Sequence, residues 1–201
     1  MSNTKDFKVR SGIQPTVYQE AVGTVVSGSV GYSLGSASYD SVSFSTSSQD
    51  TSPREVRFNA DGTKMYISGA TNDAVYQYTL STAYDVSTAS YDSVSFSVAS
   101  QDTSPNALWI NNDGTKFYIL GSVNDSVFQY SMSTAYDLST ASYDSVSFSV
   151  ASQDTAPLGL AFNSDGSKMY FSGGITDTVY QYTLSTPYNV GTASYDSVSF
   201  S

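Results

Sequence analysis

The chain has 201 residues, with 18 acidic and 8 basic side chains and a formal net charge of −10. Its few basic residues form no cluster, so we expect no nucleic-acid partner, and no apolar run approaches the roughly 20 residues that would insert in a membrane. Because the sequence has no cysteine and no histidine, it excludes disulfides, thiolate metal sites and Ser-His-Asp catalysis. We therefore expect no metal site and no cofactor.

The first segment, residues 1–36, carries no copy of the repeat that fills the rest of the chain. It lacks the apolar stretch of a secretory signal and contains scattered Pro, Gly and Ser. We expect an extended arm with one strand near residues 22–26, and we interpret the arm as a docking segment. The candidate docking residues are Phe7, Val9, Ile13, Pro15 and Tyr18.

From residue 37 onward the chain consists of one unit of 52 residues in three copies. The string Ala-Ser-Tyr-Asp-Ser-Val-Ser-Phe-Ser begins at Ala37, Ala89, Ala141 and Ala193, with a constant step. A repeat of this length decides the fold, because each copy forms one structural unit that packs on its neighbours. We divide this domain, 37–201, into a lead-in strand at 37–52 and three units at 53–104, 105–156 and 157–201.

Each unit is expected to hold four strands separated by turn signals. In the first unit a strand follows Pro53, and Asn59-Ala60-Asp61-Gly62 makes a tight turn in which Gly accepts a positive φ. The second strand runs over 64–69 and the third over 75–80. The fourth is the Ser-Val-Ser-Phe-Ser string, whose extra copy at 41–45 is the lead-in strand.

The strands alternate with a period of two, as half-buried antiparallel strands do. On the third strand Tyr76, Tyr78 and Leu80 share a face, and the fourth strand places Val and Phe on one face and Ser on the other. We interpret the third-strand aromatic residues as core packing rather than a platform for sugars. They are Tyr76, Phe128, Tyr180, Tyr78, Tyr130 and Tyr182.

An all-β chain with four short strands per unit is typical of β-propeller blades. A three-sheet β-prism is the alternative fold. Since a closed propeller needs about 4 to 8 blades, three explanations stay open: two chains close a six-bladed ring, three sheets close as a prism, or the sequence belongs to a longer product. An open stack would leave strand edges and apolar faces in water, so we expect a homo-oligomer.

Four motifs of the first unit, at 61–66, 75–78, 81–84 and 90–97, recur in the other copies. This series resembles β-propeller-like repeats in structural proteins of marine bacteriophages, and residues 3–13 are similar to the leader of phage tail-fibre proteins. The resemblance implies a virion component, in a fibre, tail adaptor or capsid-decorating role. It also implies that the arm docks on other virion proteins, and it brings no catalytic residues.

The carboxylates recur at the same place in each unit, which favours a scaffold role over chemistry. A calcium loop needs more acidic positions and a terminal Glu, and a glycosidase needs two carboxyl groups in different environments. We therefore interpret them as turn residues and predict that the chain is not an enzyme. The residues concerned are Asp61, Asp113 and Asp165, with Asp50, Asp102 and Asp154.

Positions that differ between copies are the candidate recognition residues, although drift of solvent-facing side chains would give the same variation. They lie on the first strand and in the loop before the third strand: Arg54, Asn106 and Leu158, then Arg57 and Trp109, then Thr71, Val123 and Ile175. The single Trp could be a binding hot spot or an ordinary packing residue. The alternative function is a carbohydrate-binding module that attaches to a host-surface glycan through pockets between blades.

Overall fold

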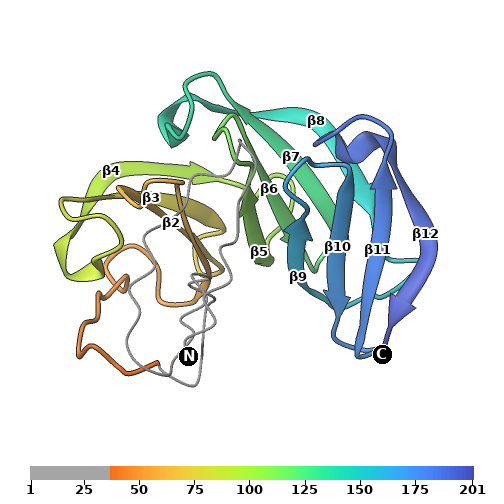
Figure 1. The fold of residues 1–201 in the computed structure, drawn as a ribbon, viewed down its shortest axis with the longest axis horizontal. Coiled ribbons are helices and arrows are strands. Elements are labelled where there is room, and N and C mark those ends of the chain that lie inside the picture. The colour runs from red at the N-terminus through yellow and green to blue at the C-terminus, as the bar shows by residue number, and fades with distance from the viewer. Residues whose placement is uncertain (1–36) are drawn as a thin grey trace, which may run out of the picture. The chain divides into compact units, whose positions relative to one another are not determined.

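The computed structural model describes residues 37–201, and the repeat domain forms the compact unit Ser41–Ser201. It contains three four-stranded antiparallel sheets, each with its strands in sequence order (Figure 1). Blade 1 consists of β1 (Pro53–Phe58), β2 (Lys64–Gly69), β3 (Ala74–Leu80) and β4 (Ala89–Ser97). Blade 2 consists of β5 (Pro105–Ile110), β6 (Lys116–Gly121), β7 (Ser126–Met132) and β8 (Ala141–Ser149). Blade 3 consists of β9 (Pro157–Phe162), β10 (Lys168–Gly173), β11 (Thr178–Leu184) and β12 (Ala193–Phe200).

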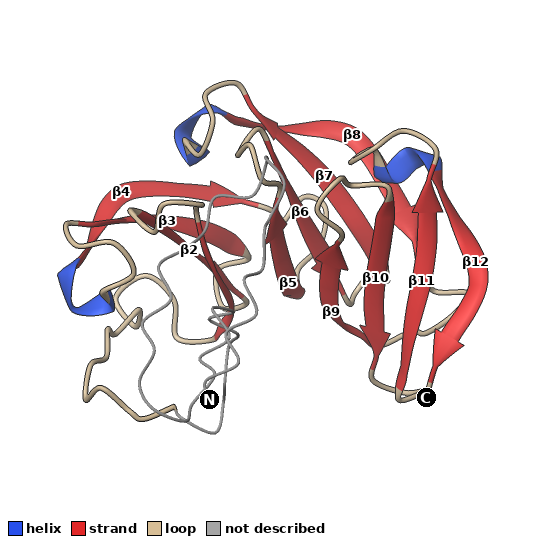
Figure 2. Cartoon of the chain, viewed as in Figure 1, coloured by secondary structure: helices blue, strands red, loops and turns tan. Residues whose placement is uncertain are grey.

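The predicted four-strand unit is confirmed, with strand starts at the expected prolines. Within residues 37–201 the helical segments are three short 3-10 turns, each in the connection from a third to a fourth strand (Figure 2). They are η2 (Val86–Thr88), η3 (Leu138–Thr140) and η4 (Val190–Thr192). No helix in the described part of the chain is long and apolar enough to cross a membrane.

The turn between the first two strands is fixed by a glycine and an aromatic ring. Gly62 has a φ of +72°, and a Cβ there would lie 2.3 Å from the ring of Tyr84. The hydroxyl of that tyrosine donates to the carbonyl of Ala60 at 2.8 Å, and its amide donates to the carbonyl of Gly62 at 2.9 Å. The positive φ expected for this Gly is confirmed, and the ring adds a second reason for the absence of a side chain.

A bulge in the fourth strand lets its side chains pack in two hydrophobic cores, that of its own blade and that of the next blade. The ladder between β3 and β4 shifts register between Gln77 and Tyr78, and Ser93 has a φ of +59°. Before the bulge Tyr91 packs on Tyr78 of its own blade, with ring centres 5.5 Å apart. After it Phe96 packs on blade 2. The fourth strand therefore links its own sheet to the next one.

Both faces of blade 2 are buried against another blade. We call the face toward the following blade the front and the face toward the preceding blade the back. Tyr118, Leu120 and Val127 on the front share a cluster with blade 3. Leu108 and Ile119 on the back share one with blade 1. Because a prism would gather its three sheets around one core, this front-to-back stacking identifies propeller-like blades, and β5 accordingly touches both β1 and β9.

The aromatic residues of the third strands lie in the core, as predicted. Tyr78, Tyr130 and Tyr182 are fully buried, and the second set is at most 8% exposed. The fourth strands also alternate as predicted, with Val and Phe half-buried and Ser exposed in blades 1 and 2. The period-two reading of these segments is therefore confirmed.

The lead-in strand predicted within 37–52 is wrong, because these residues form no strand: the repeated string is irregular apart from a bend at Ser41, and a turn follows at 47–49. A fourth strand in this fold pairs only with the third strand of its own sheet, and within residues 37–201 every third strand is already paired with the fourth strand of its own blade. The side-chain contact nevertheless persists. Phe44 packs edge-on against Tyr78 at 5.4 Å, as Phe148 does against Tyr182. The predicted arm and its five docking residues lie outside the described residues.

Candidate functional site

The aspartates before the first strands are buried and hold backbone together. Asp50, at 2% exposure, accepts hydrogen bonds from the amides of Ser52 at 2.7 Å, Thr71 at 3.3 Å and Asn72 at 3.0 Å. Burial raises the pKa of Asp50, but these donors outweigh it and hold the pKa below its usual value. The carboxylate thus fixes the loop between β2 and β3. Asp102 and Asp154 do the same in blades 2 and 3.

The aspartates of the tight turns also act locally. Asp61 accepts from the amide of Thr63 at 2.9 Å and from its hydroxyl at 2.6 Å. These bonds lower the pKa of Asp61. In residues 37–201 no group of three or more acidic side chains is placed to hold a metal ion. Turn chemistry therefore accounts for these carboxylates.

A third set of aspartates, on the fourth strands, was not singled out from the sequence. Asp92 accepts from Lys64 Nζ at 2.8 Å and from Gln77 Nε2 at 2.8 Å. The other end of this Gln crosses to blade 2, where its Oε1 accepts from the amide of Leu138 at 2.8 Å. The signal was available, because the Lys, the Gln and the Asp are the same in all three copies. Their contact only becomes visible once β2, β3 and β4 are adjacent.

Three of the predicted recognition residues join the first strands of successive blades. Arg57 Nε donates to the carbonyl of Leu108 at 2.9 Å, and its guanidinium lies 4.7 Å from the ring centre of Trp109. That ring in turn packs on Phe162. Asn106 Nδ2 donates to the carbonyl of Pro157 at 2.9 Å. The structure therefore assigns the single tryptophan a packing contact between blades.

The other five recognition candidates are exposed. Arg54 and Leu158 lie near the starts of β1 and β9, and Thr71, Val123 and Ile175 lie in the loops between second and third strands. The exposed fractions of Val123, Leu158 and Ile175 are 59%, 54% and 66%. Since β1 pairs with the end of β2 at Pro53 and Gly69, these positions share one rim of their blades. The rim loops are the ones that the buried aspartates fix.

A hollow of about 290 Å³ lies between β1 and the front of blade 3. Its polar groups include Glu55 and Arg57, whose charged atoms are 3.6 Å apart. Tyr170, Ser172 and Val179 contribute from blade 3. Among the residues that line it, Glu55 is the single carboxylate. The pair that glycoside hydrolysis requires is therefore not assembled there.

The front face of blade 3 is a feature that the sequence reading did not identify. Val179, Val198 and Phe200 on this face are exposed by 44%, 51% and 80%. The corresponding Val75 and Val127 of the earlier blades are at most 1% exposed. The repeat could have predicted this face, because it places the same apolar residues on the last blade, where no following blade covers them within 37–201.

Comparisons with known proteins support the fold. No protein-family model matches the chain, and no curated protein matches it in sequence. A protein of Bacteroides fragilis named a candidate 6-phosphogluconolactonase is similar in structure, with a TM-score of 0.56 and 11% identity over 74% of this chain and 38% of that one. A functionally unknown protein of Desulfotomaculum acetoxidans has a TM-score of 0.54 and 16% identity over 75% of this chain and 42% of its own.

The periplasmic gluconolactonase of Pseudomonas aeruginosa is also similar, with a TM-score of 0.50 and 17% identity over 71% of this chain and 41% of that one. This chain therefore spans about two fifths of the length of these structures. Identities this low establish the architecture alone. The three sheets are β-propeller-like blades.

Proposed function

We propose that this chain is a non-enzymatic structural component of a virus particle, in a fibre, tail-adaptor or capsid-associated role, docked through residues 1–36. The observation that supports this proposal most is the rim. Val123, Leu158 and Ile175 expose apolar surface next to loop backbone that buried carboxylates hold in place. Exposed aliphatic side chains on rigid backbone favour contact with protein.

The assignment to a particle rests on the resemblance of the repeat and of residues 3–13. The test is incorporation during assembly. The full chain and a variant lacking residues 1–35 are each expressed while particles form, and density-purified particles are probed with an antibody against the repeat. We expect the full chain in the particles, loss of the truncated chain, and unchanged β-structure of that chain by circular dichroism.

The two parts of the proposal fail separately. A full chain that is absent from purified particles contradicts the virion role. A truncated chain that still enters them leaves that role in place and contradicts docking through the arm. Replacing Ile175 by Asp tests the rim in the same assay, because it places a charge on an apolar surface without touching the fixed loop backbone.

Carbohydrate binding is the second candidate, and the hollow favours it. Tyr170 offers an aromatic ring beside the polar groups of Arg57, Glu55 and Ser172, which is a common composition for a sugar site. A glycan array with the wild-type chain and with Tyr170→Ala tests this function. Specific binding that is lost in the variant supports it. Trp109→Ala is the poorer probe, since that ring is covered by Arg57 and Phe162.

The names of the similar structures suggest which substrates to use in a test for catalysis. Two of those described above are named for lactone substrates, so hydrolysis of gluconolactone and its 6-phosphate is the assay to run. We expect no rate above the uncatalysed background. A rate that depends on Glu55, the single carboxylate of the hollow, would replace the non-enzymatic proposal with an enzymatic one.

A further inference from the structure

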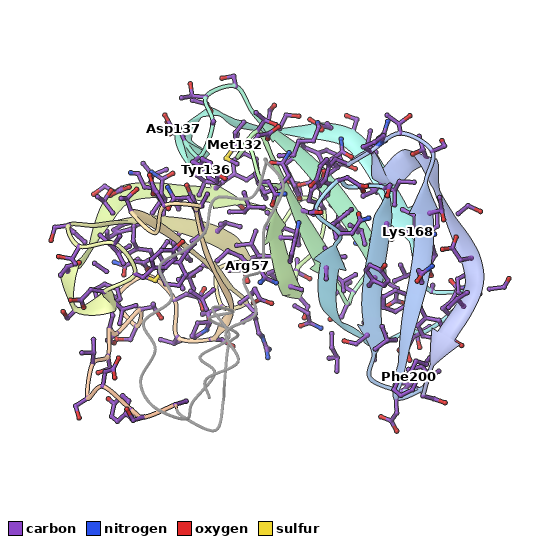
Figure 3. The ribbon with its side chains drawn as sticks, viewed as in Figure 1. Arg57, Met132, Tyr136, Asp137, Lys168 and Phe200 are labelled. Atoms are coloured by element: carbon purple, nitrogen blue, oxygen red, sulfur yellow. The ribbon has the colours of Figure 1, made fainter. Side chains whose placement is uncertain are left out.

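The two interfaces between blades use the same polar contacts. At the second, the hydroxyl of Tyr118 donates to the carbonyl of Tyr188 at 2.6 Å, and Gln129 Oε1 accepts from the amide of Val190 at 3.0 Å. At the first, the equivalent donors and acceptors are joined in the same way, with Tyr136 in the connection after β7 (Figure 3). The front of one blade therefore recognises the backbone of the next blade's helical turn.

The apolar part of these interfaces is also repeated. Phe148 packs on Tyr182 of blade 3 at 5.3 Å, and Phe96 packs on Tyr130 of blade 2 at 5.6 Å. Beside them the third-strand Val of each front face is buried. The repeat thus defines one front surface, consisting of a Tyr, a Gln, two Val and a Phe, and one back surface that fits it.

Blade 3 carries the same front surface with no blade packed on it within residues 37–201, although Glu55 and Arg57 face part of it across the hollow. The residues of this surface are Tyr170, Val179, Gln181, Val198 and Phe200. Within residues 37–201 the hydroxyl of Tyr170 and the Oε1 of Gln181 have no partner in another blade, and Phe200 stacks on no ring. In Figure 3 this Phe lies at the very end of the last strand. Of this surface, Val179, Val198 and Phe200 are exposed, whereas the other two residues are half-buried.

Blade 1 carries the matching back surface, of which one part is exposed, whereas Met65, Ile67 and Tyr76 on the same face are at most 6% exposed. Val56 is 45% exposed, although its counterparts Leu108 and Leu160 are at most 5% exposed. Tyr84 is 57% exposed. Val86 is half-buried, whereas its counterparts in blades 2 and 3 are at most 2% exposed. In the described part of the chain, the carbonyl of Tyr84 and the amide of Val86 contact no preceding blade.

We propose that the front face of blade 3 binds the back face of blade 1 in a second copy of this chain. The partner is identified by the contacts themselves, because both covered copies of this front face are covered by a blade of the same repeat. In the joint, Tyr170 donates to the carbonyl of Tyr84 and Gln181 accepts from the amide of Val86 of the second copy. The inference is independent of the proposed virion role.

One position in this interface is already occupied by a side chain of the same chain. Phe44 covers Tyr78, which is the position that Phe200 of the neighbouring copy would fill. Residues 37–45 and 193–201 are identical in sequence, but β12 pairs with β11 and the lead-in segment forms no strand. We therefore expect the lead-in segment to be displaced when the interface forms. One Phe then replaces another on the same tyrosine, and the rest of the front face becomes buried.

A joint of this kind is head-to-tail, so it closes into a ring only if the rotation allows. Two copies bring six blades, which lies in the usual range of about 4 to 8 for closed propellers. We therefore expect a dimer. Because each chain carries a net charge of −10, added salt should strengthen the association by screening repulsion.

The first experiment measures mass by light scattering on the purified full chain. We expect twice the 21.4 kDa of one chain, and a dissociation constant raised at least about tenfold by Phe200→Asp or by Tyr170→Ala. Ser199→Asp is the matched control, since it adds the same charge at the neighbouring exposed residue of β12, whose side chain lies on the opposite face of the strand, and it should leave the dimer intact. Phe44→Ala removes the side chain that competes with Phe200 of the second copy for Tyr78, so it should not weaken association.

The second experiment locates the joint. The chain has no cysteine, so Val86→Cys with Gln181→Cys can be joined by a short bis-maleimide, and covalent dimers are expected. Asn112→Cys with Ser164→Cys is the positive control, because both residues are exposed and meet across the interface between blades 2 and 3 of one chain, so the pair should react without forming a covalent dimer. Val86→Cys with Ile175→Cys should not react. A monomeric wild-type chain overturns the proposal, whatever else covers the face. A dimer that none of the front-face variants weakens also overturns it.

Discussion

The carboxyl group of Asp50 occupies the space that a side chain on Gly69 would need. A Cβ built on that glycine would lie 2.2 Å from the carboxyl carbon. Gly121 and Gly173 stand in the same relation to the buried aspartates of blades 2 and 3. Each of these glycines is therefore required by a side chain from a segment before the blade, and not by its own backbone conformation.

Gly69→Ala should destabilise the domain by about 1–3 kcal/mol, because the methyl group forces the carboxylate away from the amides of Ser52 and Asn72. Chemical denaturation followed by circular dichroism measures the loss. Gly191→Ala is the control. A Cβ there would have no neighbour nearer than 3.2 Å, and Ser87 and Ser139 already occupy the equivalent positions. Equal losses in the two variants would contradict the assignment.

The domain should lose stability in acid between about pH 4 and pH 2. Hydrogen bonds from Lys168 and Thr183 lower the pKa of Asp196 to about 2, from 3.8 in an unfolded chain. The unfolded state therefore takes up the proton first as the pH falls, and stability is present above the higher pKa and lost toward the lower one. Unfolding midpoints in urea, measured across this range, check the slope.

Removing the lysine should shift this acid transition to higher pH. Lys168→Met deletes a donor to Asp196 at 2.8 Å and should cost about 1 kcal/mol at neutral pH. Arg54→Met is the charge-matched control, since Arg54 is exposed and makes no ion pair within the described residues. If both variants unfold in acid at the same pH, the ion pair does not set the transition.

Alkaline pH should also unfold the domain, through the buried tyrosines. Burial raises the pKa of Tyr78 to about 12, whereas an unfolded tyrosine titrates near 10. The stabilising effect of keeping this phenol protonated is complete below pH 10 and is lost as the pH rises to about 12. Tyrosinate absorbance and circular dichroism should change together. Ionisation that precedes unfolding would show that the ring is accessible.

The strands were predictable because each depends on local signals. The Asp-Gly turn fixes where β1 ends and β2 begins. Polar and apolar residues alternate in Ser-Val-Ser-Phe-Ser because one face of the strand is exposed to solvent and the other packs in a core. The lead-in segment carries the same signal and fails to form a strand. A strand needs a partner for its backbone, and the nine identical residues at 37–45 and 193–201 differ only in whether β11 lies beside them.

The candidate site was less predictable, because its residues act across blades. Variation between copies singled out Arg57 and Trp109, and the structure shows them stacked on each other between β1 and β5. It also singled out Val123 and Ile175, which are exposed. Variation alone therefore did not separate junction residues from surface residues. Gln77 and Gln129 do not vary and so were not singled out in this way, although each accepts a hydrogen bond from the next blade.

Gln129→Ala should cost about 1–3 kcal/mol, because it leaves the buried amide of Val190 without an acceptor and removes a donor to Asp144. Gln181→Ala is the matched control on the terminal blade. It loses the bond to its own aspartate but, within 37–201, no bond to another blade, so it should cost less. Both are measured at low protein concentration. Equal losses would show that the bond between blades adds nothing.

Phe148→Ala and Phe200→Ala remove the same residue from the same repeated string. Phe148 packs on Tyr182 and belongs to the core around blade 3, so its loss should cost about 2–4 kcal/mol. Phe200 is 80% exposed, and its loss should change the stability of a single chain by less than about 0.5 kcal/mol. Denaturation at the lowest workable concentration, where copies associate least, measures both. A comparable cost for Phe200 under those conditions would place it in a contact made within its own chain.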